Sequence, residues 1–380
     1  MTPVPRVVTA AAAVVVLTSC GSGTSSSPAD DVSGGSAGPS RQVDSSPATL
    51  EPSPSQSTLG SSAQPLAAAP VQDLLDWKAV PGSTKDLVTV GDGWTLRVPA
   101  GAAEARLRGA SSLTIPAGAG SSITDALLDD THALVVSEDR QATHADRAVL
   151  VDLASGRKTT LDARSDPPTV VGGTWALGPK TLVHATSGSH RRYCLATVDL
   201  ADGSGTTGWC AEPRHGFRGA TITDDGTSML TFDDHRPSCR TAVQVTGSDL
   251  VPFPGAPDCK GWDSAMLEGT TIWSLVRNEH RIDAAHFYAH TDDGWFDLGP
   301  GTTGSLVTCA GSAFFTRDPG SRSDPARLMR WSPGDHTLSV AYESKGAGHA
   351  FLSPARCGGT HLTVTAYSQA GDEQVTTSLG

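Results

Sequence analysis

Apolar runs recur at regular intervals along most of the chain, and each begins directly after a turn residue. Each run passes through a small or polar pair into a stretch of aliphatic, aromatic or β-branched residues. The six clear examples, here called anchor runs, are "DTHALVV" from Asp130, "GPKTLVH" from Gly178, "GTSMLTF" from Gly226, "GTTIWSL" from Gly269, "GSAFFTR" from Gly311 and "GTHLTVT" from Gly359. Their starts lie 48, 48, 43, 42 and 48 residues apart, and a weaker match begins at Gly82. Periods of about 40 to 50 residues are typical of propeller blades and similar arrays.

The segments between the anchor runs complete the repeating unit. Stretches such as "RAVLVDLASGRKTTLD" and "CLATVDLADGSGTTGWC" have a strand pattern on both sides of a tight turn, and a further apolar run precedes each anchor run. Each unit therefore contains about four short strands, and no long stretch has the apolar spacing of a helix. The pattern predicts an all-β chain folded as a β-propeller with six to seven four-stranded blades.

Seven blades are favoured, with residues 72–121 counted as a degenerate first blade. In the six-blade alternative, that stretch supplies a closing strand and irregular cover. The last unit reaches Gly380 after about three strands, so a strand from the N-terminal side of the domain is expected to complete it. A pair of β-sandwiches is the alternative outside the propeller class.

The N-terminal residues resemble the signal of an exported lipoprotein. Arg6 is the only charged residue before Asp30, and an apolar run follows it from Val7 to Leu17, too short to span a membrane comfortably. Leu17-Thr18-Ser19-Cys20 resembles the bacterial lipobox. That resemblance implies a signal peptide over 1–19, cleavage before Cys20, and a diacylglyceryl group on the Cys20 thiol that anchors the protein to the membrane. An ordinary secretory signal that leaves Cys20 as a free thiol is the alternative.

Residues 20–71 are rich in Ser, Gly and Pro and have few large apolar side chains. Such a segment buries too little surface to offset its ordering entropy, so we expect a disordered tether before a propeller domain over 72–380. The tether contains a match to the G-x-S-x-G nucleophile motif around Ser36. That motif needs a strand before it and a helix after it, which this composition does not support.

The charge balance narrows the choice of partners. The chain has 28 Lys and Arg against 40 Asp and Glu, a formal net charge of −12. An acidic surface disfavours nucleic acid and direct adsorption to anionic lipid headgroups. We expect a monomer that contacts the membrane only through its lipid anchor.

Six cysteines remain when Cys20 is set aside, and an even number in an exported protein suggests disulfides. Six cysteines allow 15 pairings, so the sequence alone leaves the connectivity open. Cys194 and Cys210 flank a tight turn at nearly equal distance, which favours a cross-strand pair. Cys239 and Cys259 are next in order, and Cys309 and Cys357 then remain, at equivalent positions of adjacent units.

Three sequence motifs resemble cofactor, metal or catalytic sites, but none has the context that such a site needs. Gly299 to Gly304 matches G-x-G-x-x-G, but a strand follows it where a dinucleotide site needs a helix. His286 and His290 share a face of a predicted strand about 13 Å apart, too far to bind one metal ion unless the strand bends. Asp233, Asp234 and His235 form a polar turn that lacks a third catalytic group. No catalytic, cofactor or metal residue is therefore predicted.

The turn "TDDGTSML" from Thr223 resembles the Asp-Gly turn of TolB-type propeller repeats. With the lipobox and the Ser/Pro tether, the whole chain is similar to exported lipoproteins of actinobacteria. The resemblance implies a protein on the extracytoplasmic face of the cell membrane whose propeller binds a protein, peptide or glycan. The alternative is an exported propeller enzyme, such as a lyase, glycosidase or sugar oxidoreductase, with carboxylates and histidines converging at the mouth of the central channel.

Overall fold

The computed structural model describes residues 65–278, 281, 284–346 and 348–380. Within these ranges the chain is built from strands, and its helical residues form two short 3-10 turns, η1 (Ser189–Arg191) and η2 (Pro333–Asp335). No helix in the described part has the length and apolar character needed to cross a membrane. The all-β prediction is confirmed.

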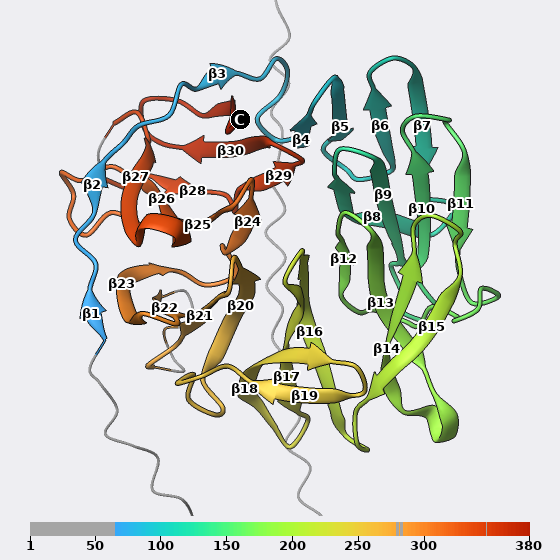
Figure 1. Ribbon diagram of the computed structural model, residues 1–380. Coiled ribbons are helices and arrows are strands. Elements are labelled where there is room, and N and C mark those ends of the chain that lie inside the picture. Colours follow the sequence, from blue (N-terminus) through green and yellow to red (C-terminus); the bar gives the residue numbers. More distant parts are fainter. Residues whose placement is uncertain (1–64, 279–280, 282–283, 347) are drawn as a thin grey trace, which may run out of the picture. The chain divides into compact units, whose positions relative to one another are not determined.

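Seven four-stranded antiparallel units follow one another along the chain and are numbered here as blades (Figure 1). Blade 1 contains β4 (Leu87–Gly91), β5 (Trp94–Val98), β6 (Glu104–Arg108) and β7 (Ser112–Pro116). Blade 2 contains β8 (Ser121–Leu128), β9 (His132–Asp139), β10 (Arg147–Asp152) and β11 (Lys158–Leu161). Blade 3 contains β12 (Trp175–Leu177), β13 (Thr181–Ser187), β14 (Tyr193–Asp199) and β15 (Gly205–Cys210).

The remaining blades have the same strand order. Blade 4 contains β16 (His215–Thr223), β17 (Gly226–Asp233), β18 (Arg236–Thr246) and β19 (Asp249–Pro252). Blade 5 contains β20 (Gly261–Leu267), β21 (Thr270–Leu275), β22 (Ala284–Thr291) and β23 (Gly294–Thr302). Blade 6 contains β24 (Val307–Cys309), β25 (Ser312–Arg317), β26 (Arg327–Ser332) and β27 (Thr337–Glu343). Blade 7 contains β29 (Arg356–Gly358), β30 (His361–Tyr367), β31 (Glu373–Ser378) and β3 (Lys78–Ala79), and the short β28 (Phe351–Leu352) also pairs with β30.

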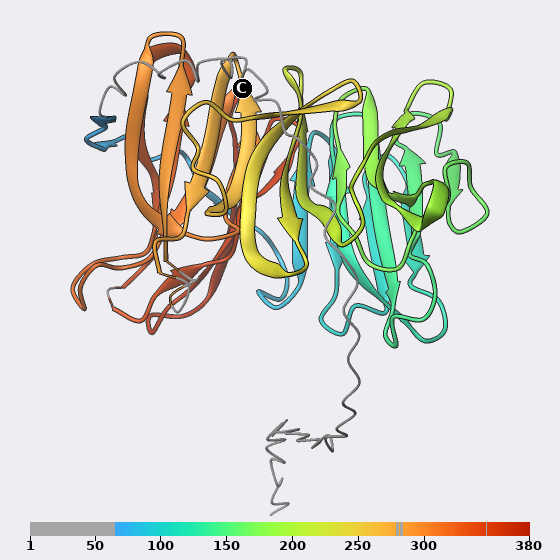
Figure 2. The ribbon, with the colours of Figure 1, turned by 90° about the horizontal axis from the view of Figure 1, so that it is seen from below.

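The first strands of the blades stand side by side around a central channel. Each contacts the first strand of the next blade, and β29 of blade 7 contacts β4 of blade 1, so the ring is closed. Figure 2 shows the blades from the side, with their strands running between two opposite faces of the domain. The β-propeller prediction is confirmed, and seven four-stranded units are present.

The anchor runs are the second strands of their blades, and their sequence pattern follows from their position. Each second strand has a neighbouring blade on both faces, so nearly all its residues are buried. In β9, Leu134 packs in the core between blades 2 and 3, while Val135 packs in the core between blades 1 and 2. In β25, Phe314 and Phe315 face opposite neighbours in the same way. Successive strand residues point to opposite faces, so a strand covered on both sides is a near-continuous apolar run.

The N-terminal side of the domain completes the last blade and continues beyond it. β3 pairs antiparallel with β31, which confirms the expected closing strand. Before it, β1 (Leu66–Ala67) pairs parallel with β23, and β2 (Val71–Gln72) pairs parallel with β27. We call residues 66–79 the clasp. Figure 1 shows it in blue along the outer edges of blades 5, 6 and 7.

The clasp moves one predicted boundary. The sequence placed residues up to 71 in a disordered tether, whereas β1 and part of β2 lie within that range and pair with the propeller. Composition could not reveal this, because the clasp is held mainly through its backbone. Leu66, Val71 and Leu74 are 63%, 51% and 57% exposed, so they give little sign of burial.

Three disulfides link the six cysteines of the propeller. Cys194 and Cys210 lie opposite each other on β14 and β15. Cys239 in β18 is bonded to Cys259, which precedes blade 5. Cys309 and Cys357 join the first strands of blades 6 and 7, with their Cα atoms 5.5 Å apart. These are the pairs that the strand layout favoured.

Candidate functional site

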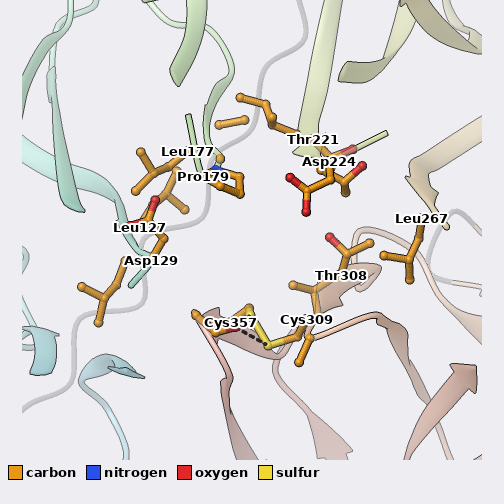
Figure 3. Close-up of a pocket in the computed structure, with 18 of the residues that line it drawn as sticks. Leu127, Asp129, Leu177, Pro179, Thr221, Asp224, Leu267, Thr308, Cys309 and Cys357 are labelled. Atoms are coloured by element: carbon orange, nitrogen blue, oxygen red, sulfur yellow. Dashed lines mark hydrogen bonds between the residues drawn. A yellow bond between two sulfur atoms is a disulfide. The ribbon is translucent and has the colours of Figure 1, made fainter. Parts of the chain in front are cut away.

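A cavity of about 630 Å³ opens at one end of the central channel. Its walls are the ends of the first strands of blades 2 to 7 and the turns that follow those strands. Leu127, Leu177, Ile222 and Leu267 are among its apolar lining residues. Figure 3 shows Asp129, Asp224 and Thr308 around the cavity, with the Cys309–Cys357 disulfide on one wall.

Blade 1 contributes no lining residue to this cavity, because blades 7 and 2 meet directly in front of it. Gly358 of β29 forms a single parallel pair with Leu128 of β8. A Cβ atom on Gly358 would lie 2.2 Å from the carbonyl oxygen of Val90, so the contact depends on the absence of a side chain there. The mouth of the channel is therefore six-sided although the ring has seven blades.

A partly buried ion pair fastens the same junction. The Arg356 guanidinium of blade 7 lies 3.6 Å from the Asp125 carboxylate of blade 2. Its Nε donates to Thr89 Oγ1 of blade 1 at 2.8 Å, and its Nη2 donates to the carbonyl oxygen of Ala126. Burial raises the pKa of Asp125 and lowers the pKa of Arg356. A charge pair held among three blades is a structural connection, so Arg356 does not offset the charge of the rim.

Acidic side chains dominate the charged rim of the cavity. The lining includes five carboxylates, from Asp129, Asp130, Asp224, Asp225 and Glu268, and Arg356 is its one Lys or Arg side chain. Within the described ranges no histidine lines the cavity, and no group of three or more His, Cys, Asp or Glu residues could hold a metal ion.

Two of the five carboxylates are used in local structure. Asp129 Oδ1 accepts from the amide of Thr131 at 2.6 Å and the amide of His132 at 2.6 Å, while its Oδ2 is enclosed without a partner in the described part. Asp225 Oδ2 accepts from the Gly269 amide of the next blade at 3.2 Å.

The other three carboxylates, from Asp130, Asp224 and Glu268, have no hydrogen bond or ion pair with any described residue. They come from blades 2, 4 and 5, so they surround the mouth rather than sit on one wall. Acidic groups above apolar walls suit a ligand that presents a positive charge on a partly apolar body.

The sequence motifs that lie in the described part of the chain do not contribute to this cavity. Cys20 and Ser36 lie outside the described residues. His286 Nε2 lies 2.5 Å from Asp297 Oδ1, so this histidine is paired with a carboxylate within blade 5. The Asp233 carboxylate accepts from the His235 amide at 2.8 Å, which is ordinary turn geometry. Gly299 to Gly304 belongs mainly to β23, where a Cβ on Gly301 would lie 2.6 Å from the Phe287 ring.

The rim carboxylates were not predicted, although the sequence contains a signal for them. Asp129 and Asp130, Asp224 and Asp225, and Glu268 all precede or open the anchor runs of their blades. Equivalent turns of a propeller meet at one end of the channel, so aligning the units would have placed these acids together. Asp and Gly are common in tight turns for local reasons, which conceals such a signal.

Comparison with known proteins identifies the fold and no family. No family model and no curated protein sequence matches the chain. Among solved structures, a prolyl endopeptidase superposes with a TM-score of 0.54 at 13% identity, covering 76% of this chain and 46% of that one. The β-propeller domain of the Trilobed protease from Pyrococcus furiosus, described as having an open velcro topology, superposes with a TM-score of 0.50 at 7% identity. That match covers 82% of this chain and 95% of that one.

The described domain is a β-propeller. At sequence identities of 13% and 7%, these matches show a shared fold and nothing more. The chain spans less than half the length of the prolyl endopeptidase. The peptidase activity in the name of that protein is therefore not transferred to this chain. Function has to be argued from the site itself.

Proposed function

We propose that the propeller is a binding module that takes a cationic group of a peptide or small amine into the six-sided mouth of its channel. The single observation that carries the proposal is the trio of unpaired carboxylates, from Asp130, Asp224 and Glu268, around one cavity. Fixed negative charges around an apolar-walled site attract and orient a positive group, and their effect weakens as salt rises.

We further propose that this module is held at the extracytoplasmic face of the cell membrane by a lipid on Cys20. The support is the resemblance of residues 17–20 to a lipobox, together with three disulfides in a chain of seven cysteines. Disulfides persist outside the reducing cytoplasm. Metabolic labelling with a radioactive fatty acid should mark the wild-type protein and not Cys20→Ser, which should also leave the membrane fraction.

The binding proposal is tested by calorimetric titration with spermidine and with a tri-lysine peptide, and a tri-glutamate peptide serves as the opposite-charge probe. We expect saturable binding of the two cations and none of the anion. The double variant D224N/E268Q should bind at least about tenfold more weakly, which corresponds to about 1.4 kcal/mol. Raising the salt concentration should weaken wild-type binding as well.

The matched control is D249N/D292N, which removes two exposed acidic charges from turns between third and fourth strands. It changes the net charge equally and leaves the cavity intact. If both double variants weaken binding by the same amount, attraction to overall charge explains the result and the cavity is not the site. Absence of cation binding to the wild-type protein would also overturn the proposal.

An exported enzyme is the second candidate, and the rim carboxylates are the observation that favours it. A pair of carboxylates can act as general acid and base on a glycosidic bond. The histidines expected for such an enzyme at the channel mouth are absent from the lining of the cavity. Turnover of a polysaccharide that is lost in D224N but retained in D249N would establish this alternative.

A further inference from the structure

A second charged feature lies at the junction of blades 4 and 5, away from the cavity. β16 runs from His215 to Thr223 toward the acidic rim, and Arg218 lies in the half of that strand farther from the rim. About six residues of strand separate it from Asp224, a span of about 20 Å. Arg240 of β18 places its guanidinium carbon 3.7 Å from the ring centroid of Trp262 in β20.

Arg240 lacks the partners that an enclosed guanidinium normally has. Its Nε and Nη1 atoms are enclosed, and neither has a hydrogen-bond partner in the described part of the chain. The third nitrogen, Nη2, is not enclosed and therefore remains open to an approaching group. Burying donors without acceptors is unfavourable, and more so when the group is charged.

Arg218 adds a second positive charge near Arg240, and this repulsion is unfavourable when no anion is bound. Burial, with a further contribution from the charge of the exposed Arg218, lowers the pKa of Arg240 to about 10. No described carboxylate forms an ion pair with either arginine, in a chain with 12 more acidic than basic residues. Arg218 pairs with Leu230 and Leu230 pairs with Ala242, two residues beyond Arg240, so the two arginines lie on the same face of blade 4.

The buried carboxylate of Asp263 does not neutralise these two arginines. Asp263 feels the charge of Arg218, but it is buried and already accepts hydrogen bonds from three donors. These are the Ser274 hydroxyl, the Gly304 amide at 3.1 Å and the Leu306 amide at 3.4 Å. Its role is to fasten the start of blade 6 to blade 5. Stacking on Trp262 would explain Arg240 alone, yet it gives no reason for Arg218 beside it.

We propose that Arg218, Arg240 and Trp262 form a binding site for an oxyanion, a carboxylate or phosphate group of a ligand. Trp262 holds the guanidinium plane in place, so the open edge of Arg240 is fixed before the ligand arrives. Guanidinium groups suit planar oxyanions because their N–H donors are arranged in a rigid fork. A bound anion would also relieve the repulsion between the two arginines. This site is separate from the acidic cavity and does not depend on the function proposed for it.

Calorimetric titration with sodium phosphate and with sodium acetate, at constant ionic strength maintained with chloride, tests the proposal on the full chain. We expect saturable binding of at least one anion. R218Q and R240Q should each bind at least about tenfold more weakly. R236Q is the matched control, because Arg236 is also exposed and lies in the same blade, where it begins β18 opposite Asp233. Stronger binding of phosphate indicates a phosphorylated ligand, and stronger binding of acetate indicates a carboxylate ligand.

R240Q removes a side chain that covers Trp262, so it could fail to fold. Arg218 is exposed, and R218Q then decides the result by itself. Equal binding in wild type and R218Q, or an equal loss in R236Q, would overturn the proposal. So would the absence of saturable binding of both anions up to about 10 mM.

Discussion

Blades 5 to 7 and blades 1 to 4 are built from the same four-stranded unit, but their outer edges differ. The outer strands of blades 5 and 6, and the third strand of blade 7, each pair with part of the clasp. The outer strands of blades 1 to 4, which are β7, β11, β15 and β19, have no further neighbour among the described strands. One side of the ring is therefore bound together from outside, and the other depends on the packing of blade faces.

The two sides use different interactions. The clasp relies on backbone hydrogen bonds, such as those from Asp73 N to Val340 O at 3.3 Å and from Leu75 N to Ala341 O at 3.0 Å. Trp77 adds the main side-chain contact, with its indole N–H on the carbonyl of Ala341 at 2.8 Å and its ring against Tyr342. The unclasped edges are short strands, which limits their tendency to pair with another chain. The clasp therefore reinforces a ring that the contact between β29 and β4 already closes, and truncation should reveal how much stability it adds.

Removing the clasp should have the largest effect. A chain that begins at Pro81 lacks β1, β2, β3 and Trp77, so blade 7 loses its fourth strand. Loss of this strand together with the partly buried Trp77 should cost about 3–5 kcal/mol, which at this size corresponds to a fall of about 10 °C in melting temperature. Differential scanning calorimetry measures this fall in melting temperature. A chain that begins at Pro65 keeps the clasp and should melt like the full chain; equal melting of both truncations would show that the clasp adds no stability.

The disulfides also differ between the two sides of the ring. Cys309–Cys357 joins blades 6 and 7 on the clasped side across 48 residues, while Cys194–Cys210 lies within blade 3 across 16. In the loop-entropy model, these links stabilise the fold by about 4 and about 3 kcal/mol. We expect C309A/C357A to lower the free energy of unfolding more than C194A/C210A in urea titrations. The reverse order would show that strand register within a blade matters more than a link between blades.

The sequence predicted features that repeat and missed features that occur once. The anchor runs revealed the second strands because both of their faces are buried, as Phe314 and Phe315 illustrate. In blade 1 the weak match from Gly82 leads into the first strand, β4, and misses the second strand, β5, whose residues are only in part buried and form no continuous apolar run. The closing strand β3 was expected, but the parallel strands β1 and β2 of the clasp were missed because backbone hydrogen bonds do not depend on side-chain identity.

The cavity shows a second limit of sequence analysis. Each rim carboxylate could be seen in a turn, but their meeting around one mouth is a property of the closed ring. The exclusion of blade 1 from that mouth depends on the contact between Gly358 and Val90, which are 268 positions apart in the chain. A single sequence does not indicate which glycine is needed for such an approach.

The contact between Gly358 and Val90 can be tested by comparing the junction of blades 7 and 1 with the outer strand of blade 3. A Cβ on Gly358 would meet the carbonyl oxygen of Val90 at 2.2 Å, and backbone cannot move aside easily. Gly208 in β15 is a strand glycine whose Cβ would meet only ordinary contact at 3.5 Å. We expect G358A to destabilise the protein by about 3 kcal/mol and G208A to change stability by less than about 0.5 kcal/mol. Similar free energies of unfolding for the two variants would contradict a close contact between Gly358 and the Val90 carbonyl.

The smallest expected effect is a pH dependence on the unclasped side, between blades 2 and 3. Asp146 is 2% exposed and accepts from the Gly172 amide at 3.1 Å. Burial raises its pKa from 3.8 to about 6, and the hydrogen bond from Gly172 only partly opposes this. The folded state therefore holds a proton that the unfolded state releases near pH 4, so this group makes the protein less stable as pH rises from about 4 to about 6.

Asp146→Asn keeps an acceptor for Gly172 and removes the titration. The free energy of unfolding of D146N, minus that of the wild-type protein, should therefore rise by about 2 kcal/mol between pH 4 and pH 7. Urea titrations at several pH values measure this difference, in which contributions common to both proteins cancel; buried His184, whose pKa is lowered by burial, is one of these. The exposed Asp292→Asn removes a surface carboxylate and serves as the control. A flat difference for D146N would mean that Asp146 is ionised in the folded protein at pH 5, and that water reaches the junction of blades 2 and 3.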